Sequence, residues 1–87
     1  MKWDTFRPLE PIVLFFPDKQ NRRTVRTARD AAEALLHDWP HDDGEAFYFA
    51  VKICLDVIVG RGEPCELRTA MLRAAGEAGV VAIAVVH

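Results

Sequence analysis

Hydrophobic residues form two short runs near the ends of the chain and three longer periodic segments between them. The first run, residues 12–16, is rich in β-branched and aromatic residues and is flanked by prolines, which predicts a buried strand. Turn-forming residues occupy 18–21, and the mostly polar stretch 22–27 predicts a second strand. The two segments therefore predict a β-hairpin whose second strand lies at a sheet edge, with Val25 as its inward-facing residue.

Three helices are predicted after the hairpin. Apolar residues spaced three and four apart indicate a helix over residues 28–39, with Thr27 as its N-cap. The next helix, residues 44–59, is apolar on nearly every side, which is typical of a central helix. A third helix is expected to begin at Pro64 and to end at Gly79, because proline suits a first turn and glycine suits a helix end.

A final strand is predicted at the C-terminus. Residues 80–86 are seven consecutive apolar residues, four of them valine, and this composition favours a strand over a helix. The resulting order, strand, strand, helix, helix, helix, strand (ββαααβ), predicts a small two-layer α+β fold. A chain of 87 residues suits one domain, which we expect to span residues 1–87.

The two apolar strands lack the alternation of apolar and polar residues that is typical of a strand with one solvent-exposed face. When helices cover only one face of a sheet, apolar and polar residues alternate along its strands. Residues 12–16 and 80–86 are apolar at every position instead. Both faces of the sheet are therefore expected to need burial, which predicts cover by a second copy of the chain, as a homodimer, or by another partner. The aromatic run 47–49 also predicts an outward-facing ring, because helical neighbours point about 100° apart.

Composition limits the classes of function. A hydrophobic fraction of 51% excludes disorder, and a net charge of −2 creates no field for nucleic acid or anionic membranes. The sequence shows no signal-peptide pattern and no run of the ~18 apolar residues that a membrane span needs. Two cysteines do not form a disulfide framework. A reduced cytoplasmic protein without a cofactor is expected.

One basic cluster is the candidate binding site, with Arg22, Arg26 and Arg29 as its candidate residues. On a strand, Arg22, Thr24 and Arg26 share one face, from which they could contact phosphate groups. No aromatic residue is interleaved for base stacking, so nucleic-acid binding is not the expected function. The competing interpretation is an edge strand that its charges protect from aggregation. The five cations of the cluster are Lys19, Arg22, Arg23, Arg26 and Arg29.

The other polar residues predict neither a catalytic site nor a metal site. Histidines and aspartates gather within residues 37–43, but Pro40 separates the two histidines and breaks the helical spacing that a shared metal needs. Cys65 falls in the first turn of the third helix, where a thiolate is favoured, yet acidic residues flank it and no histidine is near in sequence. Cys54 is expected in the core. The protein is therefore not expected to be an enzyme.

Core and cap residues also carry a family resemblance. They are Pro11-Ile12-Val13, Arg23-Thr24-Val25, Ala31-Ala32, Leu35, Leu36, Trp39-Pro40, Ala50, Cys54, Arg68, Ala74-Ala75 and Glu77-Ala78-Gly79. Over residues 6 to 80, the chain resembles the small bacterial proteins of the domain of unknown function 982 family. The resemblance implies no activity. The expected function is a non-enzymatic protein-interaction module, homodimeric through its apolar sheet surface. The alternative is a ligand- or nucleic-acid-binding regulator that uses the basic patch at 19–29.

Overall fold

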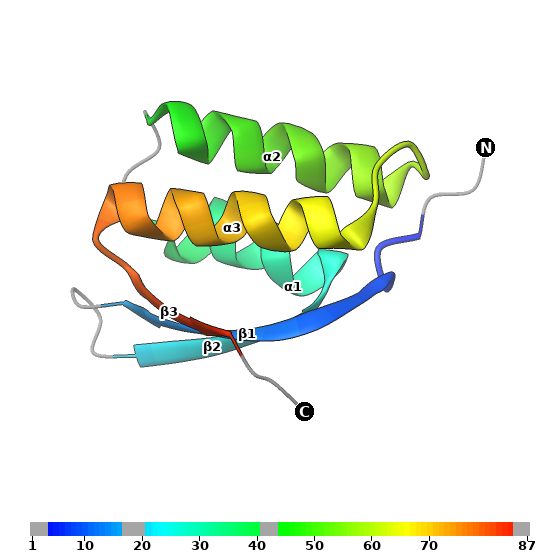
Figure 1. Ribbon diagram of the computed structural model, residues 1–87. Coiled ribbons are helices and arrows are strands. Elements are labelled where there is room, and N and C mark those ends of the chain that lie inside the picture. The colour runs from blue at the N-terminus through cyan, green and yellow to red at the C-terminus, as the bar shows by residue number, and fades with distance from the viewer. Residues whose placement is uncertain (1–3, 17–20, 41–43, 85–87) are drawn as a thin grey trace.

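The computed structural model describes residues 4–16, 21–40 and 44–84. Its strands are β1 (Pro8–Phe16), β2 (Asn21–Thr27) and β3 (Val81–Ala84). Its helices are α1 (Ala28–Glu33), the π-helical continuation η1 (Ala34–Asp38), α2 (Glu45–Ile58) and α3 (Pro64–Ala78). The strands form an antiparallel sheet in the order β2-β1-β3, and all helices lie on one side of it (Figure 1). The predicted α+β class and the order ββαααβ are confirmed.

The central strand β1 begins earlier than the prediction at residue 12. Pro8 and Pro11 both belong to the strand, and its pairing with β2 shifts register between Pro8 and Ile12. Because proline lacks a backbone N–H group, it is tolerated at such an irregularity. After it, burial alternates regularly, and Leu14 and Phe16 join Ile12 in facing the helices.

The edge strand β2 leads directly into α1, as the sequence predicts. Val25 is fully buried between the sheet and the helices. Thr27 is the N-cap of α1, and its Oγ1 accepts a hydrogen bond from the backbone N–H of Asp30 at 3.2 Å. The Asp30 carboxylate in turn accepts the backbone N–H of Arg26 at 3.0 Å. These local bonds satisfy donors that would otherwise be left open where strand changes to helix.

The helix predicted over residues 28–39 is not regular throughout, because its second half, η1, is π-helical. In a π-helix each N–H bonds to a carbonyl five residues back, so side chains are rotated relative to an α-helical face. Leu36, expected on the apolar face, is 68% exposed as a result. Trp39 remains packed, with ring centroids 5.9 Å from Phe16 and 6.5 Å from Phe47.

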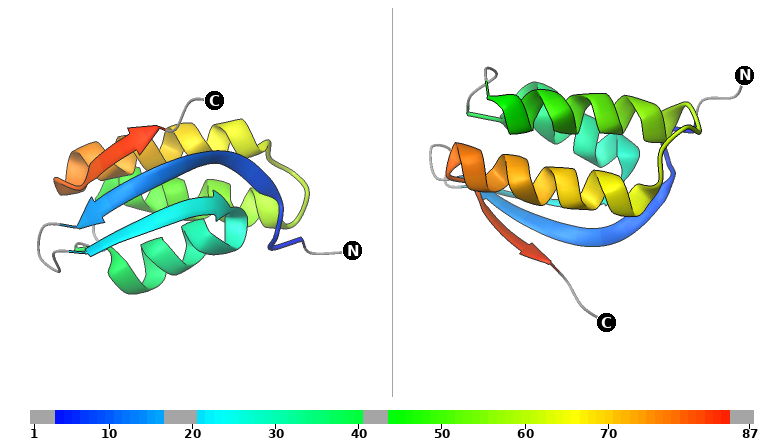
Figure 2. Two further views of the ribbon diagram at one scale, coloured as in Figure 1. Left: turned by 90° about the horizontal axis from the view of Figure 1, so that it is seen from below. Right: turned by 45° about the horizontal axis from the view of Figure 1, so that its top comes forward.

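Helix α2 is not the central helix that its sequence predicts. It lies over α1 and α3, on the side of them that faces away from the sheet (Figures 1 and 2). One side of α2 packs against α1 and α3. No element of the described chain covers the other side. Tyr48 and Phe49 are therefore exposed, which confirms the predicted outward-facing ring, and Leu55 is exposed as well. The buried residues of α2 are Phe47, Ala50, Cys54, Val57 and Ile58.

Helix α3 packs on the sheet and returns the chain to it. The helix ends at Gly79, whose φ of 74° lies in the left-handed region, and the N–H of Val80 bonds to the Ala75 carbonyl at 2.9 Å. The chain then forms β3, which confirms the predicted C-terminal strand over 81–84, and residues 85–86 of that prediction lie outside the described residues. No helix within the described ranges has the length and apolar character to cross a bilayer. The largest fully buried side chains are Ile12, Leu14, Leu67, Met71, Val25 and Val57.

Candidate functional site

The candidate functional site is the sheet face that points away from the helices. β1 presents Val13 and Phe15 on this side, because the residues between and beside them face the helices. Antiparallel pairing with β3 places Ile83 opposite Val13 and Val81 opposite Phe15. We call these four residues, Val13, Phe15, Val81 and Ile83, the outer sheet face.

The outer sheet face is apolar and open to solvent. Val81 is 57% exposed and Ile83 is 51% exposed, while Val13 and Phe15 are half-buried. The left view of Figure 2 looks onto this face, and no helix of the described chain crosses it. β1 thus carries apolar residues on both faces, as the sequence predicts, and no helix or strand among the described residues covers the outer one.

The two edges of the sheet differ in charge. The β2 edge carries Arg22, Arg23 and Arg26, and charged side chains discourage pairing with further strands. The β3 edge reads Val-Ala-Ile-Ala, without charge or proline. An apolar edge of this kind is open to another strand, so the uncovered face adjoins the less protected edge of the sheet.

Two of the predicted basic residues lie on the same side of the sheet as the outer sheet face. Arg22 and Arg26 alternate with Thr24 at exposed positions of β2, which confirms that these three share one face of the strand. Arg22 is paired in register with Phe15 and Thr24 with Val13, so Arg22 lies directly beside the apolar residues.

The third predicted residue, Arg29, does not join them. It lies on α1, where its Nε is 3.0 Å from Glu33 Oε1 and its guanidinium carbon is 5.5 Å from the Phe6 ring centroid. Arg23 also turns toward the helices, where it forms ion pairs with Glu33 and Asp38. Partial burial opposes its charged form, but the bonds and charges of these carboxylates outweigh that effect and raise the pKa of Arg23. The arginines of the basic cluster are therefore divided between two faces and partly neutralised, and Lys19 lies outside the described residues.

The histidine and aspartate cluster is only partly within the described residues. His37 and Asp38 lie in η1, whereas His41, Asp42 and Asp43 fall outside the described ranges. Among the described residues, no group of three or more potential metal ligands gathers.

The two thiols occupy contrasting places. Cys54 is buried as predicted, and its Sγ donates to the carbonyl oxygen of Ala28 at 3.5 Å. Burial raises the pKa of the Cys54 thiol to about 11, because a thiolate is poorly solvated there. Cys65 is exposed in the first turn of α3.

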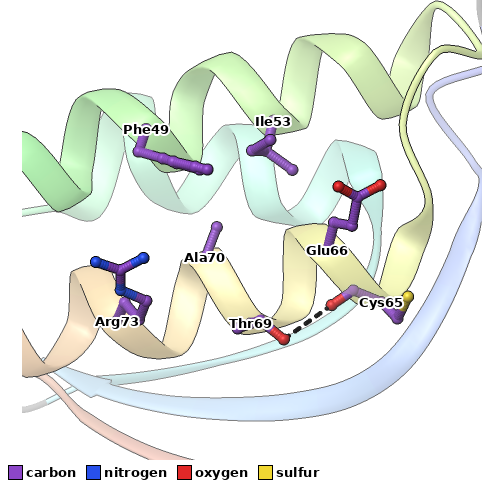
Figure 3. Close-up of a pocket in the computed structure, with 7 residues that line it drawn as sticks. All are labelled: Phe49, Ile53, Cys65, Glu66, Thr69, Ala70 and Arg73. Atoms are coloured by element: carbon purple, nitrogen blue, oxygen red, sulfur yellow. Dashed lines mark hydrogen bonds between the residues drawn. The ribbon is translucent and has the colours of Figure 1, made fainter.

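A groove between α2 and α3 is a feature that the sequence reasoning missed. It encloses about 320 Å³. The available signal was Ala70, a small side chain on the face of α3 that turns toward α2, where it leaves space (Figure 3). The groove is lined by Phe49, Ile53, Cys65, Glu66, Thr69, Ala70 and Arg73.

Comparison with known proteins gives one finding. The family model described as a protein of unknown function (DUF982) matches residues 10–82, which is most of the chain. No curated protein and no solved structure matches. The resemblance predicted from the core and cap residues is confirmed, and it brings no activity with it.

Proposed function

Because the chain belongs to the domain of unknown function 982 (DUF982) family, which supplies no activity, we propose a function from the geometry. The protein is a non-enzymatic interaction module that forms a homodimer through its outer sheet face. The observation that carries the proposal is the pairing of Val13 with Ile83 and of Phe15 with Val81 on a face that no helix of the described chain covers.

The size and continuity of this apolar surface support an interface. Four neighbouring apolar side chains on two paired strands form one patch, whereas single exposed apolar residues are ordinary on protein surfaces. Contiguous apolar patches on a soluble protein mark interaction sites, because their burial removes unfavourable contact with water.

A second copy of the chain is the partner that fits best. The four residues of the outer sheet face are all apolar, so they suit a surface that is also apolar. The same face of a second copy meets this requirement. Under two-fold symmetry, the patch of one copy contacts the identical patch of the other. Two sheets can pack face to face in this way, about 10 Å apart, with their side chains interdigitated.

The described chemistry supports a binding role over catalysis. The Cys54 thiol is buried and bonded to a backbone carbonyl, so it is a poor nucleophile. Arg23 and Arg29 are engaged by carboxylates of the helices, which weakens the alternative of a phosphate-binding regulator. Arg22 lies beside the outer sheet face, where it would border the proposed interface.

The test is the mass of the protein in solution as its concentration rises. Sedimentation equilibrium from low to high micromolar concentration should show a shift from 9.8 kDa to twice that mass. Replacing Ile83 with lysine should keep the protein monomeric, because a charge would be buried at the contact. Leu55→Lys is the matched control, since Leu55 is 58% exposed and belongs to α2, the helix that lies farthest from the sheet.

Two outcomes would contradict the proposal. One is a wild-type protein that stays monomeric at high micromolar concentration. The other is a dimer that Leu55→Lys disrupts as strongly as Ile83→Lys, because the contact would then lie elsewhere. Salt-sensitive retention on heparin that is lost on changing Arg22 and Arg26 to alanine would favour the regulator instead.

A further inference from the structure

The groove between α2 and α3 is the second surface that points to a partner, and it lies on the helical side of the molecule, away from the outer sheet face (Figure 1). We propose that it binds a small amphiphile with one carboxylate group. The apolar part of the ligand lies on Phe49, Ile53 and Ala70, and its carboxylate lies against Arg73. This site is independent of the proposed dimer interface.

The apolar lining comes from both helices. Phe49 and Ile53 extend from α2 toward α3, and the small side chain of Ala70 lies opposite them (Figure 3). Phe49 is 44% exposed, so a large part of its ring is available to a ligand. At about 30 Å³ for each water-sized group, the groove volume of about 320 Å³ holds a ligand of about ten non-hydrogen atoms. Small-molecule sites begin at about this size.

Arg73 supplies the positive charge at one end of the groove. Its guanidinium carbon lies 6.0 Å from the centroid of the Phe49 ring. In the part of the chain that the structure describes, no ion pair of Arg73 with a carboxylate occurs. A guanidinium that is held over an aromatic ring still directs its N–H groups outward in its own plane, where they can bind a carboxylate through two hydrogen bonds.

The opposite end of the groove sets the orientation of the ligand. Glu66 lies there, and its Oε1 accepts the backbone N–H of Glu63 at 3.0 Å. Its negative charge repels a carboxylate, so an anionic ligand places its charged end at Arg73 and its apolar end toward Cys65. The hydroxyl of Thr69 is engaged with the Cys65 carbonyl at 3.1 Å, which leaves the centre of the groove without a strong competing polar group.

Octanoate is a suitable ligand for the test, because it has the size that the groove admits and one carboxylate. Titration followed by amide chemical shifts should show saturable changes at Phe49, Ile53 and Ala70. Arg73→Gln should weaken binding about tenfold or more, since a charge-assisted bond is lost. Arg61→Gln is the matched control, because Arg61 is an exposed arginine in the loop before α3. Octan-1-ol, which has no charge, should bind at least about tenfold more weakly than octanoate.

Cys65 provides a second measurement at the same place. Because Cys65 is exposed and lines the groove while Cys54 is buried, bound octanoate should slow the reaction of Cys65 with a thiol reagent. Three results would overturn the proposal: shifts that map to the outer sheet face, equal binding of octanoate and octan-1-ol, or unchanged binding by Arg73→Gln. A wild-type protein that shows no saturable shifts at all would overturn it too.

Discussion

The guanidinium of Arg23 on β2 donates from its Nε to the Oδ2 of Asp38, the last residue of η1. Its Nη1 lies 3.2 Å from Oε2 of Glu33. Glu33 and Asp38 are five positions apart, and in a regular α-helix such residues point about 140° away from one another. The π-helical turn brings both carboxylates to one cation, so η1 ties the helix to the edge strand at two points.

Replacing Arg23 with methionine should therefore destabilise the fold. We expect the free energy of unfolding to fall by about 1–2 kcal/mol, because Glu33 and Asp38 keep their charges and lose the cation between them. Urea unfolding measures the change. Arg26→Met is the control, since Arg26 is an exposed residue of the same strand. An equal loss in both variants would show that the ion pairs of Arg23 add no stability.

Glu33 should make stability depend on pH in the acid range. The hydrogen bond from Arg29 lowers the pKa of Glu33 below the ordinary 4.5, desolvation opposes the change, and Arg23 adds to the lowering. Since the pKa is lower in the folded state, Glu33 stabilises the protein fully above about pH 5, and this contribution disappears as the pH falls through the folded value. The Glu33→Gln variant should lose less stability than the wild type over that range.

Urea unfolding at a series of pH values from neutral to acid tests this dependence. Glu10→Gln is the control, because Glu10 is an exposed carboxylate on β1. Its stability should fall in parallel with that of the wild type. Parallel curves for Glu33→Gln and the wild type would show that the ion pairs of Glu33 contribute nothing to the pH dependence.

The two thiols should react at very different rates in the native protein. Cys54, with a pKa of about 11, has about 0.1% of its thiol ionised at pH 8, and it is also shielded from reagents. One equivalent of an aromatic disulfide reagent should therefore react quickly, and the second only after addition of urea. The Cys65→Ser variant should lose the fast phase. A fast phase that persists in this variant would contradict the burial of Cys54.

Features that depend on local chemistry were predictable from the sequence. The inward position of Val25 follows from its polar neighbours, and the N-cap at Thr27 follows from an oxygen placed to accept an open backbone donor. The apolar outer sheet face was also predictable, because residues 12–16 and 80–86 fail to alternate.

Features that depend on contacts between distant residues were not predictable. The π-helical turn brings Asp38 to Arg23, fifteen positions away, and no local pattern marks such a contact. The sequence of α2 is apolar on nearly every side, and it does not reveal that other described elements pack against one side of the helix only. The groove arises where Ala70 faces α2, so it depends on how two helices pack rather than on the composition of either.

Two glycines near the end of α3 should respond to alanine in opposite directions. Gly76 is an exposed helical residue where an added Cβ would meet nothing within 4 Å, so Gly76→Ala should raise the free energy of unfolding by about 0.5–1 kcal/mol. Gly79 has a φ of 74°, which strains any residue with a Cβ, so Gly79→Ala should lower it by about 1 kcal/mol. Urea unfolding of both variants provides the comparison. If Gly79→Ala proved as stable as the wild type, the left-handed end of α3 would not be what turns the chain back into β3.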